Sequence, residues 1–240
     1  MSAAIEIINL RKEFGSKTAV NDLNLTVNEG EIFAFLGVNG AGKTTTIRML
    51  TGLTKPTSGD AKVLGYSILT QLDEVKKIGN LSPQETSVAP NLTVKENLEF
   101  IAGIYGFSKE ISKEKANEMI ELFGLEEVEN SKAKTLSGGW QRKVSIAMAL
   151  ITEPKVLYLD EPTLGLDVLA RRELWKAIRL LKGKVTIILT THYMEEAQEL
   201  SDNIAIMVKG NLMATGTLSE LRAKTGKENL EDIFISIVEG

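Results

Sequence analysis

Residues 37–44, GVNGAGKT, constrain this chain more than any other part of its sequence. They fit the pattern G-x-x-x-x-G-K-[ST], in which glycine lets the backbone wrap closely around phosphate. Residues 31–36 before them form an apolar run typical of a strand buried on both faces, and a helix is expected at residues 42–50. This order predicts a phosphate-binding loop at a helix N-terminus. Lys43 would then supply positive charge to the β- and γ-phosphates, and the Thr44 hydroxyl would ligate Mg²⁺.

Apolar runs and amphipathic segments alternate along most of the remaining chain. Strands are expected at residues 5–8, 23–27, 156–159, 185–189 and 204–208, and helices at residues 137–151, 169–181 and 194–200. Residues 91–130 show helical spacing of apolar residues without a strand signal, which predicts a small inserted helical subdomain. The alternation indicates an α/β fold with a parallel sheet.

Chemically active side chains follow two of the predicted strands. Asp160 and Glu161 come directly after residues 156–159, at the carboxyl end where ligands bind to parallel sheets. Asp160 would hold Mg²⁺ through water, and Glu161 would orient and deprotonate an attacking water. His192 is the only histidine and follows residues 185–189. We expect it to contact the γ-phosphate, and the alternative is a packing or surface residue.

Residues 136–140, LSGGW, resemble the signature segment of ABC-type ATPases. They stand between the phosphate loop and the acidic strand, and the resemblance covers nearly the whole chain. It places Phe14 at the adenine-stacking aromatic, Gln84 at the glutamine that links two subdomains, and Asp167 in the loop after the acidic strand.

The resemblance, together with the motifs, implies three groups of site residues. The nucleotide-binding residues are Phe14, Val20, Asn39, Gly40, Ala41, Gly42, Lys43, Thr44, Thr45, Ser137, Gly139 and Asp167. The catalytic residues are Lys43, Glu161 and His192, and the metal ligands are Thr44, Gln84 and Asp160. The implied cofactors are ATP and Mg²⁺.

The fold implied by the resemblance is an α/β P-loop NTPase. Its core sheet is mostly parallel, with antiparallel strands at the N-terminus and the inserted helical subdomain. Residues 1–84 and 152–216 would form a RecA-like core, and residues 85–151 the helical subdomain that carries the signature segment. Residues 217–240 would form a tail, expected to be one helix followed by a short amphipathic end.

The resemblance also implies a head-to-tail pair of chains with two ATP molecules at the interface. Ser137 and Gly139 of one chain would close over the γ-phosphate bound by the other. A helix N-terminus, glycines that let backbone approach and a hydroxyl donor together make an anion site. Ser137 also suits an ordinary helix N-cap. Because neither half-site is complete alone, ATP should hold the pair together and hydrolysis should release it.

Several positions depart from the commonest pattern of the family. Trp140 replaces a glutamine, Val38 stands where proline is frequent, and Leu164 stands where serine is frequent. Residues 78–84 contain one extra residue, although the spacing from Gln84 onward still fits. None of these departures removes a group needed for hydrolysis.

Bulk composition restricts the partners. The chain is 43% hydrophobic and 25% charged, has a net charge of −4, and contains no cysteine. These values are ordinary for a soluble domain, give no reason to expect nucleic acid, and exclude a disulfide framework. We find no secretory signal and no apolar run of about 18 residues. We therefore expect a cytoplasmic protein, bound to the inner face of the membrane through a separate permease.

Three functions remain open on the sequence. Residues 229–234 and 161–167 resemble single-domain ATPases of export systems with a separate permease, which favours an exporter ATPase. Its permease would contact a surface that includes Thr86, Ser87, Val88, Leu92 and Tyr105, unless these residues are simply loop or core. The first alternative is a soluble ATPase that powers protein assembly or remodelling. The second is a non-hydrolysing nucleotide sensor, which the presence of Glu161 disfavours.

Overall fold

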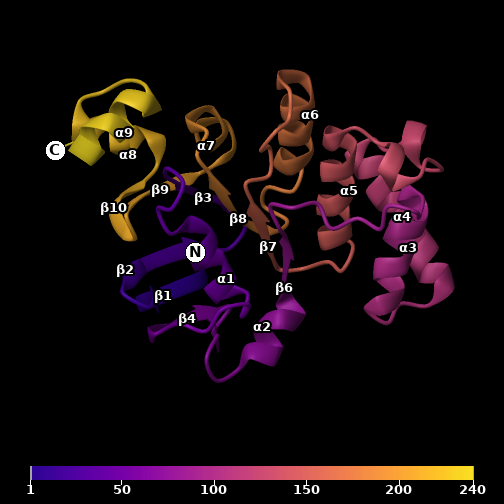
Figure 1. The fold of residues 1–240 in the computed structure, drawn as a ribbon, viewed down its shortest axis with the longest axis horizontal. Helices are drawn as coiled ribbons and strands as arrows, with labels where there is room; N and C mark the ends of the chain where they lie inside the picture. The colour runs from indigo at the N-terminus through magenta and orange to yellow at the C-terminus, as the bar shows by residue number, and fades with distance from the viewer. Residues whose placement is uncertain (1, 240) are drawn as a thin grey trace.

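A computed structural model describes residues 2–239, in which two β-sheets and their covering helices are seen (Figure 1). The larger sheet has six strands in the order β10-β9-β3-β8-β7-β6. Its strands are β3 (Ile32–Leu36), β6 (Gly79–Ser82), β7 (Val156–Asp160), β8 (Thr186–Thr191), β9 (Asn203–Val208) and β10 (Asn211–Gly216). All neighbours pair in parallel except β9 and β10. The predicted α/β fold with a mostly parallel sheet is confirmed.

The smaller sheet contains the N-terminal strands in the order β2-β1-β4-β5, and all of its pairs are antiparallel. Its strands are β1 (Ala3–Phe14), β2 (Lys17–Asn28), β4 (Ser58–Val63) and β5 (Tyr66–Ser67). The antiparallel N-terminal strands are therefore also confirmed. Strands β1 and β2 extend well beyond the apolar stretches at residues 5–8 and 23–27, because backbone pairing continues through their polar ends.

The central strands of the larger sheet contribute to two hydrophobic cores, because successive side chains point to opposite faces. Phe33 and Phe35 of β3 pack into the core shared with the smaller sheet and with α1 (Lys43–Leu50). Ile32 and Leu36 of the same strand pack into the core on the other face, with the remaining helices. Both faces of β3, β7 and β8 are buried, which explains the apolar runs at residues 32–36, 156–159 and 187–189.

The inserted helices lie at one side of the molecule, away from the small sheet (Figure 1). They are α3 (Val94–Ile104), α4 (Lys109–Phe123) and α5 (Gly138–Leu150), joined by the 3₁₀ turns η1 (Glu126–Val128) and η2 (Ala133–Thr135). Thr93 and Glu96 form a capping box that starts α3, and Ser108 caps α4. The proposed domain boundaries at residues 84 and 151 stay a prediction.

The other helices are α2 (Leu72–Ile78), α6 (Val168–Arg179), α7 (Met194–Leu200), α8 (Leu218–Thr225) and α9 (Leu230–Glu239). The tail differs from the expected single helix with a short end. Gly226 adopts a left-handed conformation (φ 69°) that terminates α8, so the tail forms two helices that pack on each other. Within residues 2–239, no helix is long and apolar enough to cross a membrane.

Candidate nucleotide-binding site

The phosphate loop connects β3 to α1 and is braced from behind by neighbouring backbone. Gly42 has φ 106°, and a Cβ at this position would lie 2.5 Å from the carbonyl oxygen of Ala19. Gly42 is therefore required both by its conformation and by the close approach of β2. Gly210, in the turn between β9 and β10, donates its N–H to Ala41 O (3.0 Å) and accepts from Asn21 N–H (2.8 Å). The loop is thus tied to two strands distant in sequence.

A cleft opens over this loop and gathers most of the predicted nucleotide-binding residues. Its walls are formed by Phe14, Lys17, Ala19, Asn39, Gly40, Ala41, Gly42, Lys43, Thr44, Thr45, Gln84 and Glu161. Val20 is one exception, because its side chain is fully buried beneath Gly42 and the preceding residue, Ala19, lines the cleft instead. Successive side chains of a strand point to opposite faces, so Ala19 faces the cleft where Val20 faces the core. Lys17 and Ala19 are cleft residues that the sequence patterns did not reveal.

The Lys43 ammonium is buried and has only oxygen partners nearby. Its Nζ donates to the carbonyl oxygens of Gly37 (2.6 Å) and Val38 (3.3 Å) and lies 3.3 Å from Oε1 of Glu161. A buried cation needs such partners, because desolvation without them is costly. The same ammonium therefore lies between the phosphate loop and the acid at the end of β7.

Asp160 accepts hydrogen bonds from two threonine hydroxyls. Thr44 Oγ1 donates to Asp160 Oδ1 at 2.9 Å, and Thr190 Oγ1 donates to the same oxygen at 2.5 Å. Gln84 lies in the same cleft. A hydroxyl, a carboxylate and an amide oxygen suit Mg²⁺, which prefers hard oxygen ligands and retains water and phosphate in its shell. Among residues 2–239, no group of three or more His, Cys, Asp or Glu side chains is arranged to hold a metal ion.

Glu161 is held at the carboxyl end of β7 in a strained conformation. Its φ is 47°, which is uncommon outside glycine and typical of functional positions. Its N–H donates to the carbonyl oxygen (3.2 Å) and the Oγ1 (3.0 Å) of Thr190. Its Oε2 lies 2.8 Å from Nδ1 of His192. The structure thus brings Glu161, His192 and Lys43 together, with Thr190 as an organising residue that sequence reasoning missed.

Arg142 is a second residue that sequence reasoning missed. From α5 it donates to the carbonyl oxygens of Pro162 (Nε, 2.8 Å), Asp160 (Nη2, 2.9 Å) and Pro83 (Nη1). Burial lowers the pKa of Arg142 to about 10, while Asp160 and Glu196 raise it, so the guanidinium stays charged at neutral pH. It joins the signature helix to the segments that carry Asp160 and Gln84. No local sequence signal marks this role, since all three acceptors are backbone atoms of other elements.

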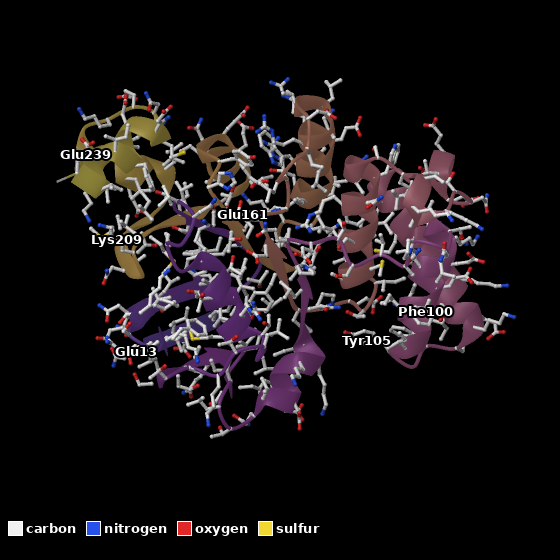
Figure 2. The ribbon with its side chains drawn as sticks, in the orientation of Figure 1. Glu13, Phe100, Tyr105, Glu161, Lys209 and Glu239 are labelled. Carbon is white, nitrogen blue, oxygen red and sulfur yellow. The ribbon has the colours of Figure 1, made fainter. Side chains whose placement is uncertain are left out.

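The signature residues lie outside the cleft, at the N-termini of α5 and α6. Ser137 caps α5 by accepting from Trp140 N–H (3.5 Å), and Asp167 caps α6 by accepting from the N–H groups of residues 169 and 170 (2.9 and 3.0 Å). A Cβ at Gly139 would lie 3.0 Å from that of Ala170, so the two helix ends approach closely. Ser137, Gly139 and Asp167 therefore form one surface, and none of them lines the cleft over the chain's own phosphate loop. Glu161 does line that cleft and is located near the middle of the molecule (Figure 2).

Comparison with known proteins identifies the family to which a chain with this site belongs. The family model described as "ABC transporter" matches residues 20–164, which is more than half of the chain. The chain belongs to the ABC transporter family. The resemblance seen in residues 136–140 is therefore confirmed, and the matched range contains the phosphate loop, the signature segment and the acidic strand.

Individual relatives agree with this assignment. The chain is 47% identical over 228 residues to the human phospholipid-transporting ATPase ABCA3. The match covers 93% of this chain but only 13% of ABCA3. It is 40% identical to the daunorubicin/doxorubicin resistance ATP-binding protein DrrA of Streptomyces peucetius, over 95% of this chain and 69% of DrrA. The solved structure of an ATP-binding subunit of an ABC transporter superposes with a TM-score of 0.86 at 29% identity, covering 98% of this chain and 99% of the other. The predicted P-loop NTPase fold is confirmed.

Proposed function

We propose that this ABC transporter ATPase hydrolyses ATP with Glu161 as general base, in a head-to-tail pair that drives export through a separate membrane permease. The observation that carries the proposal is the grouping of Glu161 with His192 (2.8 Å) and Lys43 (3.3 Å) beside the phosphate loop. A base and an orienting imidazole at adjacent strand ends, with a cation beside them, are groups that favour phosphoryl transfer to water.

Binding of the nucleotide is assigned to the walls of the cleft. Phe14 exposes its ring at the cleft edge, where it can stack on adenine, and Lys12 Nζ lies 4.9 Å from the ring centroid. The phosphate loop surrounds the phosphates with backbone N–H groups at the start of α1. Lys43 exchanges its carbonyl partners for phosphate oxygens of the β- and γ-groups. Bound Mg²⁺, held by Thr44, Asp160 and Gln84, would neutralise phosphate charge and orient the leaving group.

Hydrolysis is assigned to Glu161 and His192. The Glu161 carboxylate accepts a proton from water, and the water oxygen attacks the γ-phosphorus in line with the bond to the departing ADP oxygen. The contact of His192 Nδ1 with Glu161 fixes the carboxylate and leaves Nε2 as the ring atom available to the γ-phosphate. The strained backbone at Glu161 supports this role, because such strain is retained where geometry matters.

A second chain is needed because Ser137, Gly139 and Asp167 lie away from their own cleft. Their surface also exposes apolar side chains in and after the loop that follows β7, with Leu164 at 40%, Val168 at 55% and Leu169 at 74% exposure. Exposed apolar residues beside two helix N-termini suit an interface that also faces an anion. A head-to-tail arrangement would place this surface over the phosphates of the partner chain.

Exposed apolar residues on the inserted helices support a docking surface for the permease. Phe100 (55% exposed), Ile104 (61%) and Tyr105 (54%) lie in the second half of α3 and at its C-terminal end. Figure 2 shows Phe100 and Tyr105 on the side of the inserted helices. Tyr105 also lines a groove with Leu53 between the helices and the core. Of the surface expected from the sequence, Val88 packs partly buried against the core, so Tyr105 is the stronger docking candidate. A groove of this kind fits an amphipathic helix from a membrane chain.

The export direction rests on likeness to proteins such as DrrA, whose name refers to drug resistance. The alternative, an ATPase that remodels a soluble complex, would use the same catalytic residues. The test is purification of the protein from its own cells in mild detergent, followed by an ATPase assay and identification of the co-purifying chain. ATP turnover with an integral membrane partner supports the proposal. A soluble partner would establish the alternative, and absence of turnover would overturn the catalytic assignment.

A further inference from the structure

Glu196 is an acid that the proposed chemistry does not use, yet it lies behind the catalytic pair. It belongs to α7 and has an exposed fraction of 0%, unlike its exposed neighbour Glu195. Its Oε1 accepts a hydrogen bond from the indole Nε1 of Trp175 in α6 at 3.1 Å. Acids are seldom fully buried without a specific set of partners, so this position requires an explanation.

Two hydroxyls near Glu196 come from the segments that carry the catalytic pair. Thr163 follows Glu161 by two residues, and Thr191 immediately precedes His192. Burial raises the pKa of Glu196, and the nearby hydroxyls of Thr191 and Thr163 and the Trp175 indole oppose this rise, while the charge of Glu161 adds to it. Among residues 2–239, the buried atoms Glu196 Oε2 and Thr163 Oγ1 have no hydrogen-bond partner. The hydrogen bond from Trp175 is therefore the contact that fixes the carboxyl group.

The segments around Glu196 are closely tied to the site. Thr191 O accepts from Gly37 N–H of the phosphate loop (3.2 Å), and Thr191 Oγ1 accepts from Tyr193 N–H (2.9 Å). Thr163 O accepts from Leu166 N–H (3.1 Å) in the loop that leads to α6. A displacement of Glu196 would therefore be transmitted to both residues of the catalytic pair. It would also reach α6, the helix that Asp167 caps.

We propose that Glu196 is a positioning residue for hydrolysis. Its hydrogen bond to Trp175 joins α7, which begins two residues after His192, to α6, which follows the loop after Glu161. This tie keeps Glu161 Oε2 within 2.8 Å of His192 Nδ1. The proposal rests on the catalytic roles proposed for Glu161 and His192. It differs from a simple packing role, because packing alone predicts no specific energetic coupling between Glu196 and His192.

The test is a double-mutant cycle of Glu196→Leu with His192→Ala, scored by kcat and KM for ATP and by melting temperature. We expect Glu196→Leu to lower kcat about tenfold or more with KM changed less than about twofold, because the phosphate loop is a separate contact. In the His192→Ala protein the same substitution should lower kcat less than about twofold, because the contact that it positions is already lost. Glu196→Gln, which keeps hydrogen-bonding capacity, should stay within about threefold of wild type.

Two further variants keep the outcome interpretable. Glu195→Leu changes the exposed neighbouring acid and should leave kcat unchanged. Trp175→Phe removes the indole N–H that bonds Glu196 and takes the place of Glu196→Leu if that protein does not fold. In a Trp140→Phe background, emission from Trp175 reports whether the indole contact with Glu196 is altered, since the chain has 2 tryptophans.

The outcomes separate the two proposals. Wild-type turnover with independent, multiplicative losses in the double mutant assigns Glu196 to packing and overturns this inference alone. The same holds if a folded Glu196→Leu protein, or Trp175→Phe in its place, keeps wild-type kcat. A wild-type protein without turnover overturns the proposed function, and the inference with it.

Discussion

Oε2 of Glu161 lies 2.8 Å from Nδ1 of His192, and the two residues stand at the ends of the adjacent parallel strands β7 and β8. The contact is between side chains 31 residues apart in sequence. His192→Ala should lower kcat by about a hundredfold, because the carboxylate loses its orienting partner. KM for ATP should change less than about threefold, as the cleft walls remain. Steady-state kinetics check this, with Tyr193→Phe as the control; an unchanged kcat would refute the role of His192.

Thr190 should matter for both acids. Its hydroxyl donates to Asp160 and accepts from Glu161 N–H, and its side chain is fully buried. Thr190→Val should cost about 1–3 kcal/mol of unfolding free energy and lower kcat about tenfold. Thr186→Val provides the matched control, since its hydroxyl accepts from Gly30 N–H at the other end of β8. Thr186→Val should lose stability in a denaturation experiment but keep its kcat, and equal kinetic effects in both variants would contradict the prediction.

Arg142→Lys should be harmful although it conserves charge. One ammonium cannot reproduce a planar guanidinium that reaches three carbonyl groups. We expect a loss of about 2–3 kcal/mol in stability and a lower kcat even in folded protein, measured by urea unfolding and ATPase assay. The neighbouring Lys143 makes one ion pair with the half-exposed Glu173 and reaches no backbone carbonyl among residues 2–239, so Lys143→Gln should cost less stability than Arg142→Lys and leave kcat unchanged. Full activity and stability of Arg142→Lys would show that the contacts of the guanidinium with the three carbonyl groups are dispensable.

Ser137 combines a cap with a proposed contact across the pair, and the two roles can be separated. In a Glu161→Gln background, ATP should trap a dimer that size-exclusion chromatography detects. Ser137→Ala should lower the free energy of unfolding by about 1 kcal/mol through loss of the cap. It should in addition weaken the affinity of the dimer about tenfold. Ser108 caps α4 in the same way, so Ser108→Ala should lose stability without affecting the dimer. A dimer that is equally stable in both variants would exclude Ser137 from the interface.

Charge on the helical surface should uncouple transport from ATP hydrolysis. Phe100→Glu together with Ile104→Glu should preserve basal ATPase within about twofold and abolish stimulation by, and binding to, the permease. Ile235→Glu introduces the same charge at an exposed apolar position of α9 (43% exposed) and should have no such effect. Retained permease binding in the double variant would place the docking surface elsewhere.

The sequence predicted the elements whose patterns are local. Residues 32–36 and 156–159 are continuous apolar runs, and both lie in strands buried on two faces. Strands β4 and β6 were not predicted, because they are short and contain glycine or polar residues that gain strand geometry only by pairing with β1 and β7. The residue-by-residue assignment of the site stays a prediction.

The positioning residues could not be found by sequence patterns for a physical reason. Thr190 and Arg142 act through backbone atoms of other elements, and neither partner set is encoded by spacing along the chain. Val20 shows the opposite difficulty, since a family position alone does not tell whether a side chain faces the cleft or the core. Motifs thus identify the chemistry, whereas the register of strands decides which neighbour supports it.

The bonds from Gly210 to Ala41 and Asn21 mean that the phosphate loop acquires its shape when the chain folds, not when ATP arrives. Ordering a residue costs about 1–2 kcal/mol, and a loop that is already ordered does not lose this from its affinity for nucleotide. The hairpin of β9 and β10 lies in the last fifth of the chain, far from the motif in sequence. Changes that loosen this hairpin should therefore appear first as weakened ATP affinity, even though none of its atoms needs to contact the nucleotide.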